Sequence, residues 1–269
     1  MIDILRKAAS EAGEKLLFYF QKELKTTEKT SHQDLVTKAD LEAQKIIEEC
    51  INALMVEKGF NKHEIGFIGE ESLNTKGKHL FIIDPLDGTN NFASGFNYFC
   101  VSIAYLYDGI LTAGLIYQPY TNTYFFAEKN KGAYRVTGKE RINMRIKYTD
   151  LKDSLIATYI TSNPSLLNKI VSAILKLNIV SRGIRILGSC CLDLMHFSDN
   201  ANNINVMIHA NPRIWDIAAA KLIIEESGGV MTDWKGKPTL LDLDTPSRSY
   251  QVLVCHPDNL KKLISHING

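Results

Sequence analysis

The 269-residue sequence lacks an excess of either charge and lacks any long apolar run. It has 31 Lys and Arg residues against 30 Asp and Glu, a net charge of +1. A global field that attracts polyanions is therefore excluded, and short basic groups such as residues 129–135 are interpreted as solvated surface. Nowhere do about 18 apolar residues run together, so no membrane-spanning helix is expected.

Cysteine is scarce, and its spacing is uninformative. The five cysteines are odd in number and include no C-x-x-C pair: Cys50, Cys100, Cys190, Cys191 and Cys255. A disulfide framework and a structural zinc site are therefore both disfavoured. Residues 1–7 contain an acid in the first turn and no apolar core, which argues against a secretory signal. A cytoplasmic protein is expected.

The most informative stretch that is present is FIIDPLDGTNNF, residues 81–92. The apolar residues 80–83 predict a buried strand, and Pro85 is expected to end it because proline cannot donate the next ladder hydrogen bond. Asp84 and Asp87 would then converge on a turn, and Gly88 allows a tight backbone whose N–H groups can face an anion. Carboxylates are ligands for Mg²⁺. This stretch indicates a metal-assisted phosphate site, although Asp and Gly also dominate ordinary turns.

Two other segments supply acids that could join this site. GEES at residues 69–72 follows a short apolar run, and WDIAAA at residues 215–220 places Asp216 where a helix begins. Asp216 could equally cap that helix. Two such charges about 4 Å apart would repel by roughly 4 kcal/mol at an effective dielectric of 20, so a cluster would need a cation.

These three segments, in this order, resemble the signatures of the inositol monophosphatase family. Residues 31–40, SHQDLVTKAD, are similar to the family's mobile DLVTxxD loop, and residues 228–238 are similar to its closing segment. The resemblance covers nearly the whole chain. It implies an α/β fold of layered αβαβα type in one domain, residues 1–269, with halves of roughly 1–150 and 151–269. The D-x-D-G-T motif of haloacid dehalogenase-type phosphatases does not fit, because Leu86 adds a residue to the spacing.

The resemblance also implies a set of site residues and two or three Mg²⁺ ions. Glu70, Asp84 and the Leu86 carbonyl would hold the first ion, and Asp84, Asp87 and Asp216 the second, with a looser third ion near Glu70. Thr89 paired with Asp40 would orient the attacking water, unless Asp40 only caps a helix. Glu71 would contact the metal ligands without binding a metal itself. Substrate contacts are expected from Asp87, Gly88, Thr89, Asn90, Ser189, His209 and Asp216, with Ser162 a looser match.

His209 departs from the family pattern. An acid commonly occupies this position, seven residues before Asp216, and bonds the sugar hydroxyls. Imidazole can bond a hydroxyl, or a phosphate if protonated. A histidine at the edge of a loop is the alternative.

Three functions remain open on this evidence. The first is a lithium-sensitive inositol monophosphatase acting on a small phosphorylated substrate, working as a homodimer away from membranes. The second is a 3′-phosphoadenosine or fructose-1,6-bisphosphate phosphatase. The third is a regulatory role like that of bacterial SuhB proteins, which join transcription antitermination complexes on nucleic acid.

Periodicity predicts the elements that carry these motifs. Helices are expected at residues 4–20, from residue 37 onward, at 164–176 and at 190–198. Strands are expected at 100–107 and 111–117, joined by a turn at Asp108-Gly109, and at 154–161 and 185–188. Residues 26–32 and 199–205 are expected to be loops.

Overall fold

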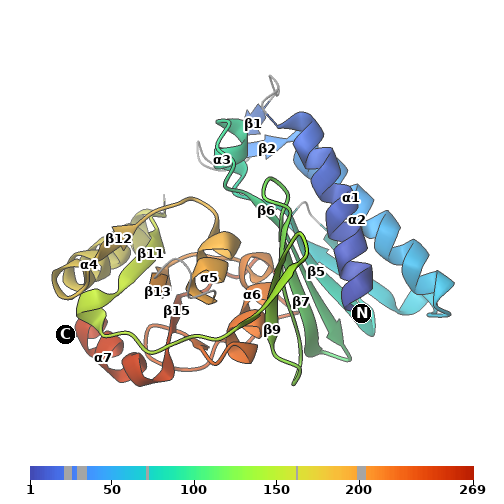
Figure 1. Cartoon of the computed structure of the whole chain (residues 1–269). Coiled ribbons are helices and arrows are strands. Elements are labelled where there is room, and N and C mark those ends of the chain that lie inside the picture. Colours follow the sequence, from blue (N-terminus) through green and yellow to red (C-terminus); the bar gives the residue numbers. More distant parts are fainter. Residues whose placement is uncertain (21–25, 29–34, 71–72, 162, 199–203) are drawn as a thin grey trace.

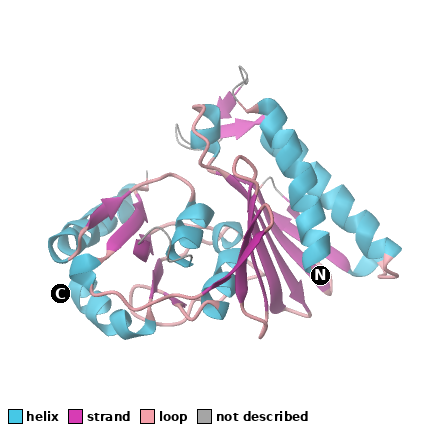
Figure 2. Cartoon of the chain, viewed as in Figure 1, coloured by secondary structure: helices cyan, strands magenta, loops and turns pink. Residues whose placement is uncertain are grey.

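The chain folds into alternating layers of helix and sheet (Figures 1 and 2). The computed structural model describes residues 1–20, 26–28, 35–70, 73–161, 163–198 and 204–269. The layers, in order, are α1 (Ile2–Tyr19) with α2 (Lys38–Glu57), an eight-stranded sheet, α5 (Cys190–Ser198) with α6 (Ile214–Glu226), a five-stranded sheet, and α4 (Pro164–Val180) with α7 (Pro257–Asn268). The predicted αβαβα arrangement is confirmed.

The eight-stranded sheet carries the first half of the site. Its spatial order is β10 (Glu140–Met144), β9 (Ala133–Thr137), β8 (Thr123–Glu128), β7 (Ile110–Gln118), β6 (Cys100–Tyr107), β5 (His79–Asp87), β3 (Ile65–Gly69) and β4 (Leu73–Asn74). Only β3 and β5 pair in parallel, with Gly69 opposite Ile83. Because the two strands run in the same direction, Glu70, which follows β3, comes next to Asp84 of β5.

Side chains of β5 alternate between two cores. Leu80 and Ile82 pack in the core that contains α5 and α6, whereas Phe81 and Ile83 pack in the core that contains α1 and α2. This period of two is what a strand covered on both faces requires. Strand β5 is therefore fixed rigidly between the layers, and so is the acidic turn at its end.

The five-stranded sheet carries the second half. Its order is β12 (Gly183–Arg185), β11 (Leu155–Tyr159), β13 (Ile204–His209), β15 (Val252–Cys255) and β14 (Val230–Thr232). Strand β13 faces α5 and α6 with Met207, and faces α4 and α7 with Val206 and Ile208. Small elements complete the described chain: β1 (Thr26–Glu28) paired with β2 (Leu35–Thr37), α3 (Thr89–Ala93), and the 3₁₀ turns Lys62–Glu64 and Leu151–Asp153.

Most predicted elements are present, including the 108–109 turn, where both residues have positive φ. Pro85 does not end its strand as predicted: β5 runs on to Asp87, with a register irregularity after Asp84. A bulge removes the need for a ladder hydrogen bond, so proline is tolerated there.

Three smaller boundaries also differ. The strand predicted at 185–188 is β12, two residues earlier. The segment 26–32 was expected to be a loop, but Thr26–Glu28 pairs with β2; residues 29–32 lie outside the described residues. Residues 199–203 of the second predicted loop also lie outside the described residues. Ile204 and Asn205 belong to β13 rather than to a loop.

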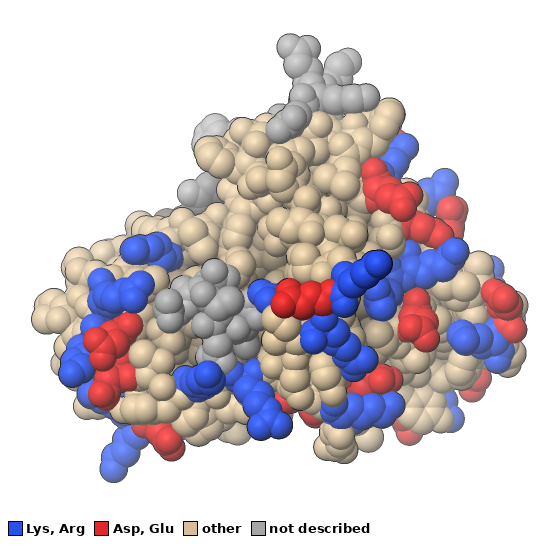
Figure 3. Space-filling view, viewed as in Figure 1, with Lys and Arg blue, Asp and Glu red and all other residues tan. Residues whose placement is uncertain are grey.

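The sequence carries nearly equal numbers of basic and acidic residues. Basic and acidic side chains are interspersed on the face in Figure 3. Among the helices that the structure describes, none combines the length and the hydropathy needed to cross a membrane.

Candidate active site

Three carboxylates meet at the end of β5. Oxygen atoms of Asp84, Asp87 and Asp216 lie within 4.8 Å of one another. The bulge after Asp84 lets two acids three residues apart turn to the same side, and α6 brings the third acid from the far half of the chain. The expected convergence of Asp84 and Asp87 is therefore present, although their backbone is strand rather than turn.

The backbone between the two acids is held by local hydrogen bonds. The Leu86 N–H donates to Asp84 Oδ1 at 3.1 Å. The Thr89 hydroxyl donates to the Leu86 carbonyl at 2.9 Å. Leu86 itself is fully buried. The carbonyl expected to bind a metal is thus held by a hydrogen bond from the threonine expected to position water.

Asp216 combines the two roles that its sequence position left open. Its Oδ2 accepts a hydrogen bond from the Arg213 N–H at 2.6 Å, as an acid in the first turn of α6 does. A carboxylate has two oxygens, so this bond does not prevent Oδ1 from binding a cation. Capping and metal binding are compatible at this residue.

The acids raise one another's pKa. Burial raises the pKa of Asp84 well above its usual value, and the nearby charges of Glu70, Asp87, Asp216 and Asp40 add to that effect. Burial and the charge of Asp87 raise the pKa of Asp216 to about 7. Five acids therefore act on one small region, in which Asp40, Asp84 and Asp87 are buried and Glu70 and Asp216 are half-buried. Such a cluster is stabilised by a divalent cation.

Asp87 is held by the N-terminus of α5. Its Oδ1 accepts from the Cys190 N–H at 3.1 Å, and its Oδ2 accepts from the Cys191 N–H at 2.8 Å. The Ser189 hydroxyl also donates to Oδ2. Burial raises the pKa of Asp87, and these hydrogen bonds oppose that rise. Ser189, expected to contact substrate, has its hydroxyl on Asp87.

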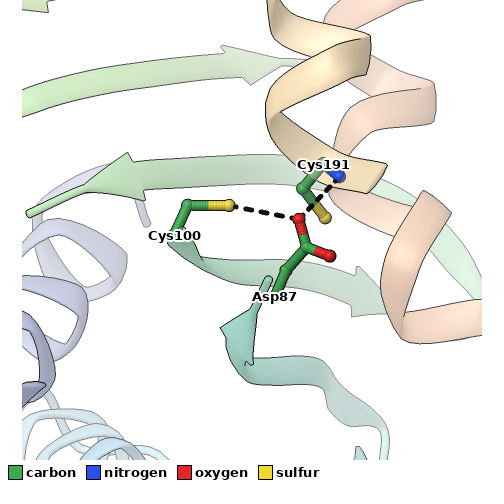
Figure 4. A group of neighbouring side chains, drawn as sticks. All are labelled: Asp87, Cys100 and Cys191. Carbon is green, nitrogen blue, oxygen red and sulfur yellow. Dashed lines mark hydrogen bonds between the residues drawn. The ribbon is translucent and has the colours of Figure 1, made fainter. Parts of the chain in front are cut away.

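Two thiols stand beside the same carboxylate (Figure 4). Cys100 Sγ lies 3.6 Å from Asp87 Oδ2, and Cys191 Sγ lies 3.1 Å from the backbone oxygen of Asp216. All five cysteines of the chain are free and buried. Burial raises the pKa of Cys100 to about 11, which keeps the thiol protonated at neutral pH in the absence of a bound metal.

The turn into α3 is built for glycine at position 88. Gly88 has φ +93°, and a Cβ there would lie 2.8 Å from the Tyr98 carbonyl oxygen. Thr89 and Asn90 follow as half-buried residues of α3.

Asn91 Nδ2 donates to the carbonyls of Tyr98 at 2.8 Å and Leu187 at 2.9 Å. Sequence analysis missed Asn91, because nothing in the doubled asparagine distinguishes the bridging residue from its neighbour.

His209 is buried at the end of β13. Its ring stacks on Tyr159 with centroids 5.2 Å apart and an interplanar angle of 1°. The Asn211 N–H donates to Nδ1 at 3.1 Å, which places the ring proton on Nε2. Burial lowers the pKa of His209 to about 3. As the last residue of β13, His209 does lie at the edge of a loop, but its ring is buried and neutral.

Half-buried Tyr98 and buried Asp193 form a second pair that the sequence did not reveal. The Tyr98 hydroxyl donates to Asp193 Oδ1 at 2.7 Å, and the Tyr98 ring stacks on His196. This pair ties α5 to the segment before β6. Glu71 and Ser162, singled out from the sequence, lie outside the described residues.

Comparison with known proteins agrees with this site. Residues 1–268 match the model of the inositol monophosphatase family. The chain belongs to this family. It is 31% identical over 276 residues to the Nus factor SuhB of Vibrio cholerae, covering 99% of this chain and 95% of that protein. It is 30% identical over 236 residues to a fructose-1,6-bisphosphatase/inositol-1-monophosphatase of Thermotoga maritima, covering 88% and 86%.

A solved structure extends the match to three dimensions. The extragenic suppressor protein suhB of Bartonella henselae superposes with a TM-score of 0.84 at 29% identity, covering 99% of this chain and 98% of that one. The predicted family, layered fold and phosphatase assignment are confirmed. The roles of individual site residues stay predictions.

Proposed function

We propose that this chain is a Mg²⁺-dependent phosphomonoesterase that hydrolyses inositol monophosphate or a similar sugar phosphate with an activated water. The observation that carries the proposal is the triad of buried Asp84 and Asp87 and half-buried Asp216, whose oxygens lie within 4.8 Å of one another. The two halves of the chain would act as one domain, because each contributes part of this triad.

The donor set fits Mg²⁺. Its potential ligands are oxygens of carboxylates and a carbonyl, which hard divalent cations prefer. Glu70, Asp84 and the Leu86 carbonyl would hold one ion, and Asp84, Asp87 and Asp216 another. A third ion near Glu70 belongs to the same proposal. Raised pKa values at Asp84 and Asp216 support it, since burial and the neighbouring carboxylates disfavour the charged forms, and a bound cation would favour them.

Protein groups would position the reactants. When bound, Mg²⁺ stabilises charge on phosphoryl oxygens and makes a nearby water more acidic. Thr89 and Asp40 would orient that water; Asp40 is buried, and its charge acts on Asp84. Helix geometry directs the N–H groups at the start of α3 outward, so those of Gly88 and Thr89 would receive the phosphate, with Asn90 beside them.

His209 would recognise the alcohol part of the substrate. A neutral ring with its proton on Nε2 donates to a hydroxyl oxygen and does not pair with a phosphate as a cation would. Stacking on Tyr159 fixes the ring plane. A polyol phosphate such as inositol monophosphate suits this donor. Fructose 1,6-bisphosphate would use the same chemistry, as the name of the Thermotoga maritima relative indicates.

A homodimer and a regulatory role are also proposed. Val171, Leu175 and Ile179 form an exposed apolar stripe along α4, with 84% of Ile179 accessible. A second copy of the chain covering this stripe would remove it from water.

Similarity to the Vibrio cholerae Nus factor SuhB over nearly the whole chain favours a second function in transcription complexes. Five free thiols suit a reducing, cytoplasmic setting.

A substrate panel tests the proposal. Phosphate release from inositol, adenosine and fructose phosphates would be measured with Mg²⁺, with and without Li⁺, using Asp84→Asn as the inactive reference. Inositol monophosphate is expected to be hydrolysed fastest, with inhibition by tens of millimolar Li⁺, a range that reflects weak binding of monovalent ions. No release from any member would contradict the proposal, and capture of transcription factors by the wild type would then favour the second function.

A further inference from the structure

Asp87 belongs to two different sets of potential metal ligands. With Asp84 and Asp216 it forms the all-oxygen triad described above. With Cys100 and Cys191 it forms a second set, whose ligand atoms also lie within 4.8 Å of one another. All three residues of the second set are buried. Its ligand chemistry differs from that of the first, because two of its atoms are sulfur.

One distance within the second set equals the separation of two ligands in a tetrahedral site. Zinc binds sulfur at about 2.3 Å and carboxylate oxygen at about 2.1 Å, which at tetrahedral angles separates the two ligands by about 3.6 Å. Cys100 Sγ lies 3.6 Å from Asp87 Oδ2. Ser189 Oγ, 3.8 Å from the same sulfur, is already hydrogen-bonded to Asp87 Oδ2, so water is the better fourth ligand. Figure 4 shows both sulfur atoms beside the Asp87 carboxylate.

We propose that Asp87, Cys100 and Cys191 form a site for a thiophilic divalent cation such as Zn²⁺. On binding, two metal–sulfur bonds form, two S–H bonds break, and both protons pass to solvent; no oxidation occurs. Two thiolates and one carboxylate then face a dication, and the α5 N–H groups that donate to Asp87 offset the remaining negative charge. Mg²⁺ does not compete for sulfur, because hard cations prefer oxygen.

Because the two sites share Asp87, a metal in the second site would inhibit the enzyme; this consequence rests on the proposed function. Mg²⁺ at the carboxylate triad would use the same Asp87 side chain that the thiophilic ion needs. Occupancy of the sulfur site therefore weakens Mg²⁺ binding and inhibits hydrolysis. The sulfur site itself is independent of any catalytic activity.

Metal titration of the whole protein tests the site directly. Metal-stripped wild type would be titrated with Co²⁺, and separately with Cd²⁺, under anaerobic conditions without substrate. Thiolate coordination produces a charge-transfer band in the near ultraviolet, which is expected to saturate at one ion per chain. Cys100→Ala and Cys191→Ala are each expected to lose the band and to bind on the order of tenfold more weakly or worse. Cys50→Ala, which removes a buried thiol of α2, is the matched control and should keep the band.

Several outcomes would overturn the proposal. The first is that wild type shows no charge-transfer band although all five thiols are titratable after unfolding. The second is that the band is undiminished in folded Cys100→Ala and Cys191→Ala. Thermal unfolding checks each variant, and Cys191→Ser replaces Cys191→Ala if the latter does not fold. Excess Mg²⁺ is expected to weaken Co²⁺ binding in wild type; no change would overturn the sharing of Asp87. Phosphate release plays no part in these measurements, so failure of the proposed function would be seen separately.

Discussion

The carboxylate of Asp87 accepts a hydrogen bond from the backbone N–H of Cys191, 2.8 Å away, across 104 residues of sequence. This bond joins the end of β5 to the start of α5. The active site is thus completed only when the two halves of the chain pack together. Conversely, the acid expected to bind metal also stabilises the N-terminus of a helix.

Replacing Asp84 with asparagine is predicted to abolish phosphate release while preserving the fold. Asparagine keeps the size of the side chain but removes a charge expected to touch two ions. It also relieves repulsion among buried carboxylates, so the metal-free variant should unfold at the same temperature as wild type or higher. Steady-state assays and thermal unfolding check both statements.

Asp193→Asn is the matched control for Asp84→Asn. Asp193 is as buried as Asp84, and an asparagine oxygen can still accept from the Tyr98 hydroxyl. Most of the activity should remain. If Asp84→Asn kept half of the wild-type kcat at saturating Mg²⁺, the metal assignment would be wrong.

Stabilisation by Mg²⁺ is predicted to grow as pH rises from 5 to 8. The pKa of Asp216 is raised to about 7 in the folded, metal-free chain, above 3.8 in the unfolded chain. Folding therefore binds a proton in this window, and metal-free stability contributed by this group falls as pH rises towards 7. A cation must displace that proton, so it stabilises more once the proton has gone.

The measurement is the difference in Tm with and without Mg²⁺ at each pH. His209 acts in the opposite direction, because its pKa is lowered to about 3, but its contribution is common to both conditions and cancels in the difference. Asp216→Asn should flatten the dependence. A Tm difference that is constant from pH 5 to 8 in wild type would speak against a proton-linked metal site.

His209→Ala is predicted to impair recognition of the sugar and to spare the chemistry. One uncharged hydrogen bond left unmade costs about 1–3 kcal/mol, so KM for inositol monophosphate should rise roughly tenfold or more. Hydrolysis of a small aryl phosphate should be nearly unchanged. Equal losses on both substrates would place His209 in the catalytic machinery, and no loss on either would remove it from the site.

Asn91→Asp is predicted to destabilise the connection between the halves. The change replaces an amide that donates to two carbonyls with a carboxylate that repels them. The expected cost is about 1–3 kcal/mol, with activity lost before global unfolding. Asn178→Asp, the same change at an exposed position of α4, is the control; an acid in the last turn of a helix costs about 0.3–1 kcal/mol, so stability should fall less and activity should not change. Unaltered stability in Asn91→Asp would show that the bridge contributes little.

The sequence was sufficient for the parts of the fold and site that depend on local patterns. Residues 80–83 predicted a buried strand; the resemblance to the inositol monophosphatase family, rather than any local pattern, implied that Asp84, Asp87 and Asp216 share one site. The course of β5 past Pro85 was mispredicted because bulges depend on pairing with β6, which is a tertiary property. The hydrogen bonds from Ser189, Cys190 and Cys191 to Asp87 and the placement of Cys100 were not predictable, since they connect distant segments.

The most direct test of the central claim is phosphate release from inositol monophosphate by metal-stripped wild type as Mg²⁺ is added back. No release is predicted in the presence of a chelator, followed by a saturable recovery with Mg²⁺ that Asp84→Asn does not show at any concentration. Undiminished release by wild type in the chelator would contradict the proposed role of the Asp84, Asp87 and Asp216 triad.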